Sequence, residues 1–151
     1  MTQFTLPLQK DRQRPIVFLD YLANSYVMLD TGALFPVWCG DEDVLKKIGG
    51  TPLIYDQSFG GFGGSARGTV YKLPKFRLGQ LIFPNLPVIA SRYNLPCQMI
   101  MSATMFSGLI YEIDNGSHRL NVTVPDKESN VRNLTVEDRN GRLHVLCTGG
   151  C

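Results

Sequence analysis

The stretch Tyr26-Val27-Met28-Leu29-Asp30-Thr31-Gly32-Ala33 carries the strongest indication of a fold in this sequence. A run of apolar and aromatic residues predicts a strand that ends in an aspartate and a Thr-Gly turn. A carboxylate at the end of a buried strand needs a reason, because an unpaired buried charge is costly. Asp-Thr-Gly is also an ordinary strand-ending turn. The stretch alone therefore allows two interpretations, a catalytic carboxylate or a plain turn.

A glycine-rich segment follows at Ser58-Phe59-Gly60-Gly61-Phe62-Gly63-Gly64-Ser65, between two β-forming stretches. Glycine permits backbone angles that are closed to other residues, so the segment predicts the tip of a hairpin. A phosphate-binding loop is disfavoured, because no Lys-Ser/Thr and no helix start follow. A plain flexible loop is the other alternative. A flap that closes over an extended ligand fits the flanking strands better.

A third segment, Gln98-Met99-Ile100-Met101-Ser102-Ala103-Thr104-Met105-Phe106, is an apolar strand that leads into small residues and a short helix. We interpret its methionines and phenylalanine as core residues.

In order and spacing, the three segments resemble the retropepsin family of single-domain aspartic proteases, here a bacterial or mobile-element relative. The family's strand ends in Asp-Thr/Ser-Gly-Ala, matched by residues 30–33, and its double-glycine flap is matched by residues 60–64. Its apolar pair before a short helix is matched by Ile100-Met101. The resemblance covers Phe4 to Asp114. It implies an all-β, closed-barrel-like acid protease fold with one or two short helices.

The resemblance also implies roles for individual residues. Asp30 is the expected general acid–base, the Thr31 hydroxyl ties two loops together, and Gly32 lets the substrate backbone approach. The expected substrate-binding residues are Ala33, Leu34, Phe59, Gly60, Gly61, Phe62, Gly63 and Gly64. Further candidate pocket walls are Val37 and either Val88 or Ile89, with core packing as the alternative.

The chain departs from the family pattern at three places. Ser102 stands where the family has Gly, and Ala103 replaces the Arg that commonly helps to brace the dimer. Leu34 and Phe35 replace polar residues that often hold the substrate backbone. We therefore expect more apolar subsites near these two residues.

Only one Asp-Thr/Ser-Gly occurs in the chain. The aspartic protease mechanism uses two carboxyl groups on one water, so the second must come from another copy across a two-fold axis. We therefore predict a homodimeric aspartic endopeptidase that hydrolyses extended peptides. The alternatives are a dimeric, non-catalytic peptide-binding module on the same fold, and a purely structural β-barrel from a mobile element or virus-like particle.

Composition narrows the remaining classes. The chain has 151 residues, 44% of them hydrophobic, and a net charge of only +2, which argues against a nucleic-acid-binding surface. No apolar run approaches the roughly 20 residues that cross a bilayer. Four cysteines and two histidines form no zinc pattern. We expect no metal, no cofactor and no membrane partner, and a cytoplasmic protein with reduced thiols.

Most expected elements are strands bounded by Gly, Pro and Asn. They are Thr2–Leu6, Pro15–Leu22, Ser25–Asp30, Leu53–Phe59, Ser65–Leu73, Lys75–Leu78, Leu81–Pro87, Val88–Ala90, Gln98–Met101, Leu109–Asp114, Arg119–Val124, Asn133–Asp138 and Arg142–Leu146. Helices are expected at Asp41–Ile48 and Ser102–Ser107. Gly79-Gln80, Asn115-Gly116 and Asn140-Gly141 are expected hairpin turns.

The protease domain is expected at 1–125, with a C-terminal β-hairpin extension at 126–151 that packs on the same domain. Three roles for the extension are open. It could complete the dimer interface, shield a sheet edge or occupy the cleft as an inhibitory segment.

Overall fold

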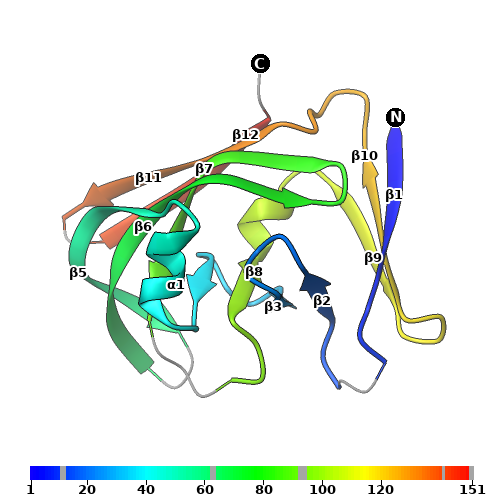
Figure 1. Ribbon diagram of the computed structural model, residues 1–151. Coiled ribbons are helices and arrows are strands. Elements are labelled where there is room, and N and C mark those ends of the chain that lie inside the picture. Colours follow the sequence, from blue (N-terminus) through cyan, green and yellow to red (C-terminus); the bar gives the residue numbers. More distant parts are fainter. Residues whose placement is uncertain (11–12, 62–63, 92–94, 141, 150–151) are drawn as a thin grey trace.

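The computed structural model describes residues 1–10, 13–61, 64–91, 95–140 and 142–149, and for 58–66, Arg142 and Gly149 it describes the backbone alone. Most of these residues lie in strands (Figure 1). In chain order the elements are β1 (Thr2–Pro7), β2 (Ile16–Leu19), β3 (Ser25–Asp30), β4 (Val37–Trp38), α1 (Glu42–Lys47), β5 (Thr51–Gly61), β6 (Gly64–Leu78), β7 (Leu81–Ala90), β8 (Met99–Ser102), η1 (Ala103–Phe106), β9 (Ile110–Asp114), β10 (Arg119–Val124), β11 (Arg132–Arg139) and β12 (Arg142–Gly149).

The strands form three sheets. The largest has the order β2-β3-β8-β4-β7-β6-β5, the second is β1-β10-β9, and the third is the β11–β12 hairpin. Within the largest sheet, β3 pairs with β8 in parallel, and β4 runs parallel to β7. The all-β prediction is therefore confirmed. The closed barrel is not found, because no pairing joins the outer strands β2 and β5 among the described residues.

Two pairs of expected strands are each one long strand in the structure. β6 runs through Pro74, and β7 runs through Pro84 and Pro87. Leu73 pairs with Leu86 and Lys75 pairs with Pro84, so the strands are paired in the same register before and after Pro74. Proline removes one donor, which a sheet tolerates at an irregularity without ending the strand. The expected strand Pro15–Leu22 is shorter, because its last residues form the turn into β3.

The hairpin turns only partly follow the prediction. Gly79 has a φ of 58° between Leu78 and Leu81, and a Cβ there would lie 2.3 Å from the Phe4 ring, so glycine is required. The two-residue turn at Asn115-Gly116 is wrong. Asp114 pairs with Arg119, which leaves a four-residue loop whose positive φ belongs to His118. The Asp114 carboxylate accepts the Ser117 N–H at 3.1 Å, and this bond favours the longer turn. The turn at Asn140-Gly141 includes Gly141, which lies outside the described residues.

Both expected helices are present and short. Asp41 is the N-cap of α1 and accepts the Asp43 N–H at 2.9 Å, as its place before an acidic first turn predicts. The Trp38 indole N–H donates to the Asp41 carbonyl at 2.9 Å, which fixes α1 against the sheet. The second helix, η1, is a single 3₁₀ turn. Among the described residues, no helix is long and apolar enough to span a bilayer.

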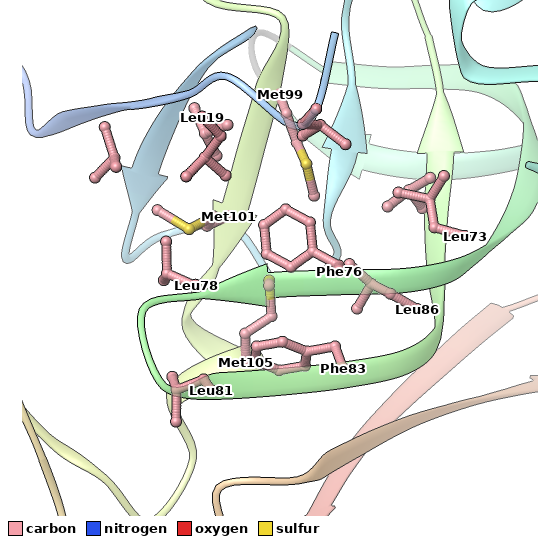
Figure 2. Close-up of a cluster of buried hydrophobic side chains, with 14 of the residues drawn as sticks. Leu19, Leu73, Phe76, Leu78, Leu81, Phe83, Leu86, Met99, Met101 and Met105 are labelled. Atoms are coloured by element: carbon pink, nitrogen blue, oxygen red, sulfur yellow. The ribbon is translucent and has the colours of Figure 1, made fainter. Parts of the chain in front are cut away.

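The main core lies between the long β6–β7 hairpin and the β3–β8 pair. Figure 2 shows Phe76 and Phe83 gathered with Met101 of β8 and Met105 of η1. The two phenylalanine rings have centroids 5.9 Å apart in a tilted arrangement. All four side chains are fully buried, which confirms that the methionines near Ser102 are core residues. The core thus packs η1, together with β8, against the β6–β7 hairpin.

The C-terminal hairpin covers one face of the largest sheet, beside β7 (Figure 1). Its residues Val136, Leu143 and Val145 pack against Phe35, Val70 and Ile89. Leu134 belongs to the main core. The Ile82 N–H donates to the Asn130 carbonyl at 2.8 Å, which joins the start of the hairpin to β7.

Candidate functional site

Asp30 lies at the carboxyl end of β3, next to Ser102 at the end of β8. The two residues are register partners in the parallel pair, so their side chains lie on the same face of the sheet. The preceding pair on that face, Met28 and Ile100, packs in a small cluster. The alternate residue Leu29 packs in the main core. The residues before Asp30 on both faces of β3 are therefore buried, whereas Asp30 itself is partly exposed.

The turn after β3 fixes the carboxylate locally. The Gly32 N–H donates to Asp30 Oδ1 at 2.9 Å, and the Ala33 N–H donates to the Asp30 carbonyl at 3.1 Å. A Cβ at Gly32 would lie 3.4 Å from the same oxygen, an ordinary contact. The Asp-Thr-Gly sequence thus places one carboxylate oxygen against its own backbone and leaves Thr31 exposed.

Helix η1, which directly follows β8, forms hydrogen bonds to this turn. The Ala103 N–H donates to the Ala33 carbonyl at 3.1 Å, and the Thr104 hydroxyl donates to the Leu34 carbonyl at 2.6 Å. Residues 30–34, which we call the Asp30 loop, are therefore held at both ends. Sequence reasoning did not identify the role of Thr104. A hydroxyl residue among apolar neighbours in a short helix was the available signal.

Ser102 occupies the position where the resemblance led us to expect glycine. Its side chain is fully buried, and its hydroxyl has no hydrogen-bond partner among the described residues. A buried hydroxyl without a partner is unusual in a protein interior. It sits beside Asp30, so the chain places a second polar group at the end of the same face.

The glycine-rich segment forms the end of the β5–β6 hairpin. Gly61 pairs with Gly64 and Phe59 pairs with Ala66, so the two strands are joined at residues 62–63. Phe62 and Gly63 lie outside the described residues, as do the side chains of 58–66. The hairpin contains a register shift between Ile54 and Gln57, where Asp56 has a φ of 53°.

An exposed ion pair spans this irregularity. Arg67 donates from Nε to Asp56 Oδ1 at 2.8 Å and from Nη2 to the Asp56 carbonyl at 2.6 Å. The hydrogen bond from Arg67, together with its charge, lowers the pKa of Asp56 below its ordinary value. Both side chains are largely exposed, so solvent screens the pair.

The candidate pocket walls differ in accessibility. Leu34 is 76% exposed in the Asp30 loop, although it is a large apolar residue. Val37, Val88 and Ile89 are buried in the packed clusters instead. For these three residues the structure favours the core-packing alternative. Leu34 is the apolar side chain that this loop presents to solvent.

A comparison with solved structures agrees with the architecture. No family model and no curated protein matches the sequence. The chain nevertheless has a retropepsin-like fold. Its structure is similar to the crystal structure of a retropepsin-like aspartic protease from Rickettsia conorii, with a TM-score of 0.55 and 17% sequence identity. The alignment covers 80% of this chain and 89% of that one.

Proposed function

We propose that this chain is an aspartic endopeptidase that acts as a homodimer, with Asp30 of each copy on one shared water. The observation that carries the proposal is the position of Asp30, at the end of β3 beside β8, with its carboxylate held by the Gly32 N–H at 2.9 Å. The retropepsin-like fold supports the same class of activity. In this proposal residues 1–125 form the protease domain and 126–151 an extension packed on it.

The mechanism needs the two carboxyl groups in different protonation states. An ionised Asp30 removes a proton from the water while the water attacks the scissile carbonyl. The protonated Asp30 of the other copy polarises that carbonyl and later supplies a proton to the leaving amine. Two carboxyl groups this close share one proton, and aspartic proteases are the established example. The Gly32 hydrogen bond and the bonds from η1 hold the loop so that little reorganisation is needed during the reaction.

Substrate binding is proposed at the surface between the Asp30 loop and the glycine-rich hairpin. Gly32 and Ala33 lie where an extended peptide would approach the carboxylates, and Leu34 offers an apolar contact. The tip at residues 59–64 would close over the peptide and exclude water. Backbone hydrogen bonds would hold the peptide as an added strand, and alternate side chains would enter pockets.

A second candidate, a dimeric peptide-binding module without catalysis, is favoured by one observation. Leu34 is a highly exposed apolar residue of the Asp30 loop itself, and binding a peptide would cover it. This candidate keeps the same surface and dimer but needs no carboxylate pair.

Cleavage-site profiling separates the two candidates. Wild type and Asp30→Asn are incubated with a proteome-derived peptide library between about pH 4 and 7, a range chosen because carboxyl groups titrate at its acid end. We expect wild type to cut within extended peptides and Asp30→Asn to cut none while remaining folded and dimeric. Asp114→Asn is the matched control, because Asp114 also accepts a backbone N–H in a turn but lies in another sheet. Binding without cleavage by wild type would favour the module.

A further inference from the structure

Arg132, the first residue of β11, is completely buried although it carries a charge. Buried arginine requires hydrogen-bond acceptors, because its desolvation is costly. Its Nε donates to the Met105 carbonyl at 3.0 Å, and its Nη2 donates to the Ser107 carbonyl. Both acceptors lie at the carboxyl end of η1, where carbonyl groups have no partner within the helix.

Glu128, a second residue of the extension, lies against the segment that follows η1. Glu128 lies 3.5 Å from Arg132 Nη1 as an ion pair and is itself mostly buried. Its carboxylate also lies against Gly108, where an added Cβ would come within 2.2 Å of Glu128 Oε1. Gly108 has a φ of 77°, so this close approach and the backbone turn both require glycine. Arg132 thus binds the carbonyls of Met105 and Ser107, and Glu128 packs against Gly108.

Cys147 on β12 adds a third contact to this cluster. Burial raises the pKa of the Cys147 thiol, and the charge of Arg132 together with a hydrogen bond from it opposes that rise. Arg132 is therefore integrated in the hairpin as well as in η1. Arg132 therefore connects the C-terminal extension to η1, which precedes the extension in the chain.

The opposite end of η1 holds the Asp30 loop. The Ala103 N–H donates to the Ala33 carbonyl, and the Thr104 hydroxyl donates to the Leu34 carbonyl. Helix η1 is one short 3₁₀ turn, a geometry that is weak without tertiary support. The bonds at its carboxyl end therefore add to the core packing of Met105 and Phe106 in holding the helix that braces the loop at its amino end.

We propose that Arg132 is a positioning residue for the Asp30 loop, so that the C-terminal extension maintains the site through η1. This inference rests on the proposed function only for its effect on catalysis. The physical coupling from Arg132 through Met105 and Ser107 to Ala33 and Leu34 does not depend on it. This role differs from the three that the sequence left open, because it makes the extension a support of the site.

Amide hydrogen exchange tests the coupling directly. The full chain is compared as wild type, Arg132→Met and Arg139→Met. Met keeps an apolar stem but donates no hydrogen bond, and Arg139 is the matched control because it lies on the same strand in an exposed pair with Glu137. We expect exchange in Arg132→Met to rise about tenfold or more at 103–107 and at 30–34. The control should leave both segments unchanged.

Two exchange results would overturn the inference. One is a rise confined to the 132–149 hairpin with residues 30–34 unchanged. The other is a rise at 30–34 and 103–107 that is no larger than the loss of global stability, measured by denaturant unfolding of the same variant, accounts for. If Arg132→Met does not fold, native-state exchange of wild type in increasing denaturant decides the question. The account expects 30–34, 103–107 and 132–134 to open as one unit, and separate opening of the loop contradicts it.

Peptide cleavage supplies the catalytic readout. We expect Arg132→Met to lower kcat and to raise KM, because the Asp30 loop carries both the carboxylate and part of the proposed peptide-binding surface and becomes less ordered. Arg132→Lys should recover part of the activity, since it restores the charge and N–H donors on a single nitrogen, without the planar fork of arginine. An unaltered kcat in a folded Arg132→Met would overturn the catalytic part. If wild type cleaves nothing, the proposed function fails, whereas the exchange result still decides the coupling.

Discussion

The β5–β6 and β11–β12 hairpins have the same local design and opposite surroundings. Each is antiparallel and is joined by two residues, between Gly61 and Gly64 in one and between Arg139 and Arg142 in the other. Each contains an arginine in an ion pair. Arg67 is 61% exposed beside Asp56, whereas Arg132 is completely buried. Secondary structure alone therefore does not indicate how strongly a hairpin is held.

The difference suits the two proposed tasks. The first half of β5 exposes Leu53 and Tyr55, and the ion pair between Asp56 of β5 and Arg67 of β6 is screened by solvent. Weak attachment of this kind is expected for the movement over a ligand that we propose for this hairpin. The C-terminal hairpin places Leu134 and Arg132 in the interior, as expected for an element that must remain fixed. The sequence predicts that the first hairpin is functional, and we propose from the burial of Arg132 that the second supports the site.

The largest expected effect is the difference in stability loss between substitutions of the two arginines, Arg132 and Arg67. Arg132→Met should lower the free energy of unfolding by about 3 kcal/mol, because it leaves the buried Met105 carbonyl and the partly buried Ser107 carbonyl without their donor and Glu128 without its partner. Arg67→Met should leave the midpoint of urea unfolding nearly unchanged. Equal losses from the two substitutions would contradict the contrast between the hairpins.

A second effect of similar kind concerns leucines within the C-terminal hairpin. Leu134 is part of the main core, so Leu134→Ala should cost about 2–3 kcal/mol through lost burial and a cavity. Leu146 is 55% exposed on β12, and Leu146→Ala should stay within about 0.5 kcal/mol of wild type. Chemical denaturation measures both. A negligible loss at Leu134 would mean that the hairpin does not share the core.

The smallest effect is the pH dependence of the Asp56–Arg67 pair. The pKa of Asp56 is lowered in the folded chain, so its contribution is present above the ordinary value of 3.8 and disappears as pH falls through the lowered folded value. The melting temperatures of wild type and Asp56→Asn should differ slightly at pH 7 and low salt, and coincide in strong acid or high salt. A large difference that persists in high salt would show that this hairpin is held more firmly than its exposure indicates.

Local sequence patterns predicted much of the fold. The apolar run before Asp30, the acidic start of α1 and the paired glycines each identify an element from neighbouring residues. The two-residue strand β4 was missed, because Val37-Trp38 is too short to show a periodicity. The breaks expected near Pro74 and between Pro87 and Val88 did not occur, because pairing on both sides carries each strand through its prolines.

The part of the site that the sequence did not predict depends on distant contacts. Thr104 and Arg132 act on backbone carbonyls 70 and 27 residues away, and carbonyl acceptors leave no trace in the sequence. Arg132 lies in a polar segment and reads as a surface residue until its burial is known. The roles proposed for Thr31 and for residues 59–64 stay predictions that rest on the resemblance to retropepsins.

The central claim is that two Asp30 carboxyl groups, one from each copy, act on one water. Mixtures of wild type and Asp30→Asn at constant total concentration, after subunit exchange, test it most directly. The account predicts that activity falls as the square of the wild-type fraction, so an equal mixture retains about one quarter. A linear fall, with about one half retained, would mean that each chain works alone and would contradict the account.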